Sequence, residues 1–511
     1  MVKVPDAMRT KKSIRNIATA LAGQFFWILI NFFARMVFIK VLGTEYLGVH
    51  GLFTNIISMI SLAEMGIGSA IIYSLYKPLA LGEEQKIKAL MHFFRSAYHI
   101  IGLVVLVLGL AVLPFLDFII KDKANIPNLS FIYLLFLADA VLSYFFAYKR
   151  SLIEADQKGY IVTTYHYIFV ALINGLQIVV LLLTKNFIFF MTVKMLFTLT
   201  ENFMISLKAE QIYPFLKEKS VAELDATEKK GIYQNVYAMF FHRLGGVVVN
   251  GTDNILISYY AGLVVVGLYS NYYMILTALN AIIGQIFTAA TASIGNLNAL
   301  VGKEKSYVIY KAIYFANFWF YGFSSICLYV LFNPFITLWV GKEFIMSDLI
   351  VTIIVINFFV TGMRKSTLMF RDSLGLFWND RYKPLFESII NLVASIILAS
   401  RYGIVGVLVG TFISTMTTCF WVEPYVLYRN GFNSRLREYF SRYGLYALVT
   451  LVAGFVTWYA CGLVGGVTIT SFVVKLLICL LIPNVIFLLI FSWTKEFKYL
   501  SNIVMRVIKK A

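Results

Sequence analysis

The sequence predicts an all-α polytopic membrane protein, and three observations support this. Hydrophobic residues make up 60% of the 511 residues, charged residues only 14%, and the mean hydropathy is +0.79. Soluble domains are about half apolar and about a quarter charged. The apolar segments are long and continuous, without the alternation of a membrane β-strand, and about 20 helical residues cross the hydrocarbon. We therefore expect helices rather than a barrel.

About fourteen segments are apolar and long enough to cross the membrane. In chain order we expect spans near 18–40, 46–74, 95–117, 129–148, 160–183, 187–211, 232–260, 264–294, 307–332, 346–370, 383–400, 404–427, 443–463 and 468–493. The longest polar stretch on the inner side covers only residues 213–231. A soluble catalytic domain does not fit there, so we do not expect an enzyme.

The formal net charge of +18 follows the expected topology. With the N-terminus inside, and with residues near the end of a span counted with the adjoining segment, six of the 44 Lys and Arg residues are outside, four are within spans, and the remaining 34 are inside. The six outside residues are Lys40, Lys121, Lys123, Lys185, Lys342 and Arg401. This asymmetry is the positive-inside rule. It predicts cytoplasmic termini and argues against a nucleic-acid partner.

An internal repeat is visible at an offset of 219 residues. The segment LGTEYLGVHGLF at 42–53 follows the first span, and AGLVVVGLYSNY at 261–272 follows the seventh. The matched pairs are Gly43 with Gly262, Gly48 with Gly267, His50 with Tyr269, and Phe53 with Tyr272. Because the two segments occupy the same topological position, we interpret the chain as a duplication.

The duplication predicts two pseudo-symmetric lobes. We expect an N-terminal six-helix lobe at 1–212, a cytoplasmic linker at 213–231, a second six-helix lobe at 232–428, and two additional helices with a cytoplasmic tail at 429–511. Each half has an even number of spans, so both enter the membrane in the same orientation. Such bundles are typical of alternating-access transporters. The alternative, a duplicated bundle without a transport path, leaves buried polar groups at the seam unexplained.

Cationic residues inside spans are candidates for substrate binding. An ionised side chain at mid-bilayer costs roughly 2.5–3.5 kcal/mol on insertion scales, so each one needs a function or a partner. Arg35 lies in the outer part of the first span, and Arg243 with its neighbour His242 lies in the inner third of the seventh. We expect these to line a cavity. Lys194, near the outer end of the sixth span, either joins them or extends to the membrane surface.

Acidic residues inside spans are either counter-ions for these cations or sites for a coupling ion. Glu64, Asp139 and Glu201 lie deep in the second, fourth and sixth spans. Lys194, Glu201 and Lys208 are seven residues apart and therefore share one helix face. An unpaired buried charge is several kcal/mol less favourable than a paired one, so counter-ion and ligand roles both stay open.

Asp253 belongs to NGTDNILISYY, in the expected seventh span. Ten residues at 100° separate it from Arg243 by about 80° around the helix, so the two do not simply pair. It needs a partner on another helix, a wet cavity, or a bound proton or cation. The alternative is an aspartate bonded to the backbone beside a kink at Asn250–Gly251.

The four cysteines are expected to be packing residues. Cys327, Cys419, Cys461 and Cys479 lie in or beside apolar segments. They lack the close spacing and the histidine partners of a metal site, and they do not predict a disulfide framework.

The sequence resembles the bacterial polysaccharide transporter family, the repeat-unit flippases of the multidrug/oligosaccharidyl-lipid/polysaccharide exporter superfamily. The resemblance covers nearly the whole chain and depends on TDNILISYYAGLVVVGLYSNYYMI (252–275), VLGTEYLGVHGLF (41–53) and AEMGIGSAIIYSLYKPLALGEEQKIKAL (63–90). It implies a two-lobed bundle with a central cavity that opens alternately to each side. Cationic residues of that cavity correspond to Arg35 and Arg243, and the aspartate of the TDN motif is Asp253.

The resemblance also implies the cargo. That cargo is an oligosaccharide on polyprenyl pyrophosphate, moved to the outer leaflet of the bacterial cytoplasmic membrane for capsule, O-antigen or exopolysaccharide synthesis. Membrane lipids, a polysaccharide polymerase and glycosyltransferases are the implied partners. We expect no cofactor, and the energy source is either H⁺ or Na⁺ coupling or the gradient of the cargo itself. A lipid II flippase and a cation-coupled multidrug antiporter of the same superfamily stay as alternatives.

Overall fold

The structure is a computed structural model that describes residues 6–61, 68, 74–76, 78–79, 81–120, 126–156, 158–218, 224–225, 229–230, 232, 251–300 and 303–508. These residues are almost entirely helical, and none of them lies in a strand. They include twelve helices that are long and apolar enough to cross a membrane. The expected all-α, multi-pass membrane architecture is therefore confirmed for the described part of the chain.

Twelve such helices agree with about fourteen expected spans. The spans expected at 18–40 and 46–74 are joined in one long helix, α1 (Asp6–Ile60), which breaks at Gly43. Most of the span expected at 232–260 lies outside the described residues, although residues 251–261 are helical. Each of the remaining expected spans has its own helix.

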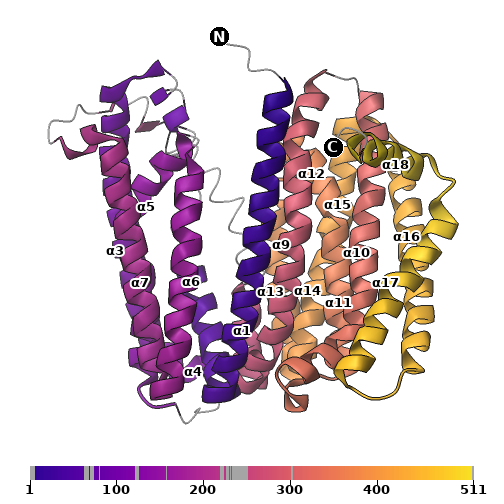
Figure 1. Cartoon of the computed structure of the whole chain (residues 1–511), viewed down its shortest axis with the longest axis horizontal. Coiled ribbons are helices and arrows are strands. Elements are labelled where there is room, and N and C mark those ends of the chain that lie inside the picture. The colour runs from indigo at the N-terminus through magenta and orange to yellow at the C-terminus, as the bar shows by residue number, and fades with distance from the viewer. Residues whose placement is uncertain are drawn as a thin grey trace. The chain divides into compact units, whose positions relative to one another are not determined.

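Residues 22–270 form one compact unit, which we call the N-terminal unit. In it α5 packs against α3 and α7, and α6 packs against α7. After most of α1, its helices are α3 (Glu84–Val112), η2 (Leu113–Phe115), α4 (Leu116–Ile119), α5 (Leu129–Ala155), α6 (Gly159–Thr184), α7 (Phe187–Ile212) and η3 (Pro214–Lys217), coloured indigo to magenta in Figure 1. The start of α9 also belongs to this unit.

Residues 1–21 and 271–511 form the second compact unit, the C-terminal unit. Its helices are most of α9 (Leu263–Leu300), then α10 (Lys303–Trp339), η4 (Lys342–Phe344), α11 (Asp348–Met363), α12 (Lys365–Ser373), η5 (Leu376–Asp380), α13 (Lys383–Tyr402), α14 (Ile404–Thr417), α15 (Cys419–Val426), η6 (Leu427–Phe432), α16 (Leu436–Gly462), α17 (Ile469–Phe491) and α18 (Lys495–Ile508). The boundaries of the two lobes expected from the sequence stay a prediction.

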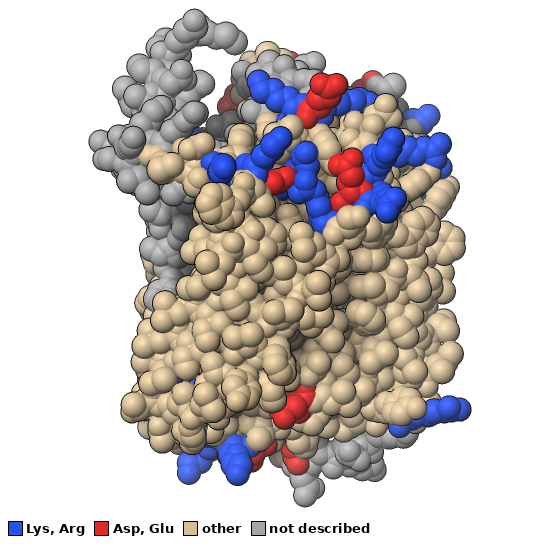
Figure 2. Space-filling view, turned by 90° about the vertical axis from the view of Figure 1, so that its right-hand side faces the viewer, with Lys and Arg blue, Asp and Glu red and all other residues tan. Residues whose placement is uncertain are grey.

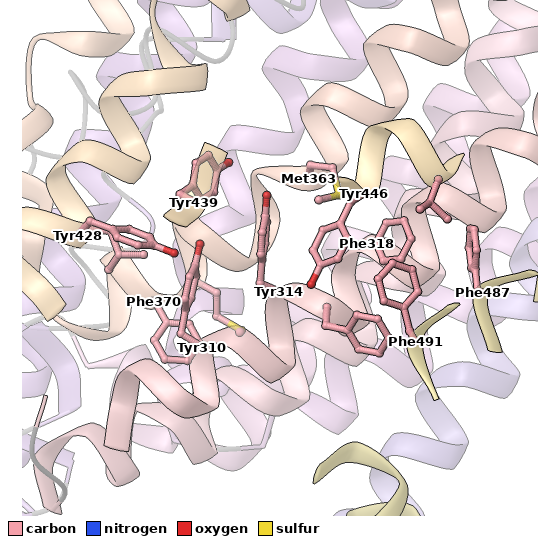
Figure 3. Close-up of a cluster of buried hydrophobic side chains, with 14 of the residues drawn as sticks. Tyr310, Tyr314, Phe318, Met363, Phe370, Tyr428, Tyr439, Tyr446, Phe487 and Phe491 are labelled. Atoms are coloured by element: carbon pink, nitrogen blue, oxygen red, sulfur yellow. The ribbon is translucent and has the colours of Figure 1, made fainter. Parts of the chain in front are cut away.

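An aromatic core organises the C-terminal unit around α10, which packs against α11, α12, α16, α17 and α18. Tyr310, Tyr314 and Phe318 are spaced four residues apart, so they share one face of α10, and all three are fully buried. Figure 3 shows this row extending to Tyr446, whose ring stacks on Phe318 with centroids 4.3 Å apart. Stacked and edge-on rings contribute about 0.5–1.5 kcal/mol per pair beyond their buried area.

Charged side chains are concentrated at the ends of the helices. On the face shown in Figure 2, Lys and Arg gather mainly at the upper end, and a broad band without charged residues lies below them. Such a band is expected where hydrocarbon surrounds the protein, because charged side chains there are costly.

The repeat glycines have matching backbone geometry. Gly43 breaks α1 with φ 83°, and Gly262, its partner in the repeat, separates the helical residues 251–261 from α9 with φ 88°. An L-amino acid with a side chain rarely adopts such angles, whereas glycine does so at no steric cost. Both copies therefore break the helix at a glycine with positive φ in the same position of the repeat, which supports the internal repeat.

The second glycine of each repeat segment lets two backbones touch. A Cβ on Gly48 would lie 2.1 Å from the carbonyl oxygen of Leu263, and a Cβ on Gly267 would lie 2.5 Å from that of Thr44. Backbone atoms cannot move aside as the end of a long side chain can. The helix that follows Gly43 and the start of α9 therefore meet at a contact that only glycine permits.

We expect Gly48→Ala to destabilise the protein by at least about 1–3 kcal/mol, the usual cost of overpacking. Gly175→Ala in α6 is the control, because a Cβ there meets nothing within 4 Å. It should be neutral or slightly stabilising, since alanine favours helix. Thermal unfolding of both variants in detergent checks this, and equal melting temperatures for the two would contradict the proposed backbone contact.

Candidate functional site

Arg35 is held by the repeat segment. It lies in α1, eight residues before Gly43, or about 12 Å along the helix from the break. Its side chain is half-buried, and Nη2 donates a hydrogen bond to the Ser270 hydroxyl. That hydroxyl in turn donates to the carbonyl of Gly267 at 2.7 Å. The close helix contact at Gly267 thus orients the serine that receives the guanidinium.

Lys194 and Asp139 form a loose ion pair between α7 and α5. Lys194 Nζ lies 3.4 Å from Asp139 Oδ2, and the side chains are 34% and 15% exposed. The ammonium group also lies 5.7 Å from the centre of the Phe136 ring. Asp139 Oδ1 is buried and has no hydrogen-bond partner among the described residues. Because Lys194 is a third exposed, this ion pair stabilises the fold little.

His50 lies near enough to both cations to feel their charges, and it was not identified as a site residue from the sequence. The charges of both Lys194 and Arg35 act on its imidazole. Its ring packs edge-on against three phenylalanine rings at centroid distances of 5.4–6.5 Å; these are Phe38, Phe136 and Phe187. His50 is seven residues beyond Gly43, and Lys194 is seven beyond the start of α7, so each lies about 10 Å from a helix end. In the sequence, the only feature that distinguished His50 was its position in the internal repeat, where it matches Tyr269.

The resulting site combines two cations with one acid. Arg35 and Lys194 are the cations, and Asp139, the acid, lies beside Lys194. Guanidinium and ammonium groups beside apolar rings bind phosphate oxygens, and arginine does so with a fork of two donors. We call Arg35, His50, Asp139 and Lys194 the cationic site.

Glu201 has its partner outside this site. Glu201 is buried on α7, and its carboxylate lies 3.1 Å from His166 Nδ1 on α6. Lys208, on the same helix face, contacts Gln211 instead. Asp253 lies half-buried in the helical residues 251–261. Glu64, His242 and Arg243 are outside the described residues, so their predicted roles stay predictions.

A buried charge cluster in the C-terminal unit was missed by the sequence analysis. Glu423 of α15 is fully buried and accepts hydrogen bonds from Arg364 Nε at 3.0 Å and Nη2 at 2.7 Å. Lys383 Nζ of α13 donates to the same carboxylate. Arg364 also lies 3.6 Å from Glu387. Both Arg364 and Glu423 fall near the inner ends of expected spans. Their opposite charges at similar expected depth were the feature of the sequence that could have indicated a pair.

The N-terminal unit has an ion pair at the corresponding position. Lys149 of α5 lies 2.5 Å from Glu210 of α7 and also donates to Ser206. Arg364 follows Lys149 by 215 residues, and Glu423 follows Glu210 by 213, close to the repeat offset of 219. Each pair joins the fourth and sixth expected spans of its half, which is further support for the duplication.

The cysteines behave as packing residues. All four are free thiols, and Cys461 and Cys479 are buried in an apolar cluster with Leu331. Among the described residues, no group of histidine, cysteine and acidic side chains is arranged to hold a metal ion.

No protein-family model matches the chain, and no curated protein matches its sequence. Solved structures do match. The lipid II flippase MurJ in an inward closed conformation has a TM-score of 0.67 and 14% identity, over 92% of this chain and 98% of its own. An inward-facing multidrug resistance MATE family transporter of the MOP superfamily has a TM-score of 0.61 and 15% identity, over 79% of this chain and 94% of its own.

A MOP superfamily transporter from Pyrococcus furiosus, described as having a binding pocket of reverse polarity, also matches. Its TM-score is 0.53 and its identity 16%, over 82% of this chain and 95% of its own. At these identities the similarity establishes the fold. The chain has the fold of the transporters of the MOP (multidrug/oligosaccharidyl-lipid/polysaccharide exporter) superfamily.

We expect Glu423→Gln to destabilise the protein by about 3–5 kcal/mol, because it leaves Arg364 and Lys383 buried without their shared counter-ion. Glu154→Gln is the control, because Glu154 forms an exposed pair with Arg150 whose loss costs under about 1 kcal/mol. Thermal unfolding of the two variants in detergent is the measurement. A smaller shift for the Glu423 variant than for the Glu154 variant would rule out a structural role for the cluster.

Proposed function

We propose that this protein is a flippase that moves polyprenyl-pyrophosphate-linked oligosaccharide repeat units from the cytoplasmic to the outer leaflet by alternating access. The fold shared with MOP superfamily transporters over most of the chain supports transport. The similarity to a lipid II flippase over 92% of the chain supports a lipid-linked cargo. The resemblance of the sequence to polysaccharide transporters supports the repeat unit as the cargo.

The cationic site is the observation that carries this proposal. A pyrophosphate group that leaves water for hydrocarbon loses its hydration, and the medium offers it no hydrogen bonds. Arg35 and Lys194 supply the missing donors, and the phenylalanine rings around His50 keep the local dielectric constant low, which strengthens the attraction. An anionic head group therefore fits the site better than a cationic drug does, so the multidrug alternative is the weaker one.

The lipid II alternative needs a direct comparison of cargoes, because both cargoes carry a pyrophosphate. The cationic site binds the part that they share, so it does not distinguish them. We place the protein in the bacterial cytoplasmic membrane with both termini in the cytoplasm, following the distribution of Lys and Arg.

We expect Arg35→Ala to reduce flipping of a fluorescent polyprenyl-pyrophosphate oligosaccharide in proteoliposomes at least tenfold, and Arg35→Lys to retain part of the activity. The forked guanidinium explains the difference between them. Lys475→Ala, which removes another cation from the first third of a membrane helix, α17, is the control and should leave flipping unchanged. Wild-type rates in Arg35→Ala, with normal insertion, would exclude the cationic site. Transport of lipid II but not of repeat units would exclude the proposed cargo.

Asp139 is the residue through which an ion could control the site. Its Oδ1 has spare capacity to accept a proton or Na⁺, and its Oδ2 is near Lys194. An ion on Asp139 neutralises the counter-charge of Lys194, so ion binding and cargo binding should strengthen each other. Asp139→Asn imitates the ion-bound state.

We expect Asp139→Asn to bind the cargo at least as tightly as the wild type, and with an affinity that no longer changes with Na⁺ concentration. Binding measured across a series of Na⁺ concentrations, with Asp117→Asn as the control, tests this. Wild-type transport that is indifferent to both ion gradients would exclude coupling at Asp139. The energy would then come from the gradient of the cargo.

A further inference from the structure

A cavity of about 560 Å³ lies in the C-terminal unit where η6 passes into α16. Its lining residues are Tyr425, Tyr428, Arg429, Asn433, Ser434, Arg435, Leu436 and Glu438. The η6 segment is a turn of π-helix that ends at Asn433 in a left-handed conformation, with φ 56°. A π-helical turn is rare and is often found at functional sites. None of these residues belongs to the cationic site or to the buried charge cluster.

Two arginines give this cavity a net positive charge. Arg429 and Arg435 are both exposed, and Glu438 is the one acid among the lining residues. Glu438 Oε2 already accepts a hydrogen bond from the Tyr307 hydroxyl at 2.6 Å. Arg429 donates to the Tyr425 hydroxyl, and its guanidinium lies 5.6 Å from the centre of the Tyr425 ring. This contact holds the Arg429 guanidinium against the Tyr425 side chain at the edge of the cavity.

The backbone adds hydrogen-bond donors of the same kind. The helix α16 begins at Leu436, and its N-cap residue Arg435 makes no side-chain capping bond. The first N–H groups of a 27-residue helix carry a partial positive charge and attract anions. The fully buried Tyr428 side chain also lines this cavity, and its hydroxyl points toward Tyr310 in the aromatic core (Figure 3).

We propose that this cavity binds a phosphate group, carried either by an anionic lipid of the adjacent leaflet or by a free phosphate ester. Forked guanidinium groups, hydroxyls and a helix N-terminus are the donors that phosphate oxygens use in proteins. The cavity lies between two candidate membrane spans, Ile404–Phe432 and Leu436–Gly462, and the ends of such spans are where lipid head groups are expected. The site is separate from the proposed transport function, and its failure leaves that function untouched.

Binding to the purified full chain in detergent tests this. The probes are dioctanoyl phosphatidylglycerol, dioctanoyl phosphatidylcholine and inorganic phosphate, measured by calorimetry. We expect phosphatidylglycerol to bind at least tenfold more tightly than phosphatidylcholine, and Arg429→Gln/Arg435→Gln to lose at least tenfold of that affinity. Inorganic phosphate that competes for the site identifies the phosphate group itself as the ligand, whereas phosphatidylglycerol binding without competition identifies the lipid.

The matched control is Arg437→Gln/Lys498→Gln, which removes the same charge from exposed residues that do not line the cavity. This control should bind like the wild type. An equal loss of affinity in both double variants would show diffuse surface attraction and overturn the site, as would equal binding of the two lipids. Arg429→Lys/Arg435→Lys keeps the positive charge but removes the forked guanidinium groups. We expect its affinity to lie between those of the wild type and of Arg429→Gln/Arg435→Gln, which would show that the loss in the glutamine variant is not caused by misfolding.

Discussion

The close approach of two backbones at Gly48 and Gly267 is the constraint on which the cationic site depends. Two helices whose backbones touch cannot shift without losing the contact, because no side chain lies between them to adapt. Ser270 follows Gly267 by three residues and bonds both to its carbonyl and to Arg35. A charged side chain in a membrane helix is therefore held by a fixed partner, which lowers the cost of placing it there.

The buried charge cluster and the cationic site hold their charges differently. In the C-terminal unit, Glu423 has no exposure and is bound by two cations in short, well-oriented contacts. Such a cluster costs several kcal/mol to disrupt, so it suits a permanent structural role. In the N-terminal unit, the contact of Lys194 with Asp139 is longer and partly exposed to solvent. A pair of that kind can give up one partner for a ligand at small cost.

Much of the fold could be predicted from the sequence. Long apolar segments indicate which residues cross the membrane, and glycines indicate where the backbone adopts angles that other residues rarely adopt. The break at Gly43 and its counterpart at Gly262 are examples. Partners of charged residues were harder to predict. Helical spacing predicts that Glu201 and Lys194 share a face of α7, but Glu201 contacts His166 of α6 whereas Lys194 contacts Asp139 of α5. Such pairings depend on how helices are rotated against one another, which the periodicity of one helix does not specify.

The same reason explains why His50 and Glu423 were missed. His50 is a neutral residue in an apolar segment, and its importance arises from rings on three helices that surround it. Glu423 lies near the end of an expected span, where a charged residue is usually interpreted as part of an exposed loop. Its burial results from Arg364 and Lys383 closing over it from α11–α12 and α13. A residue at the end of a span is thus exposed or buried according to its tertiary partners, and its depth in the sequence alone does not decide between these outcomes.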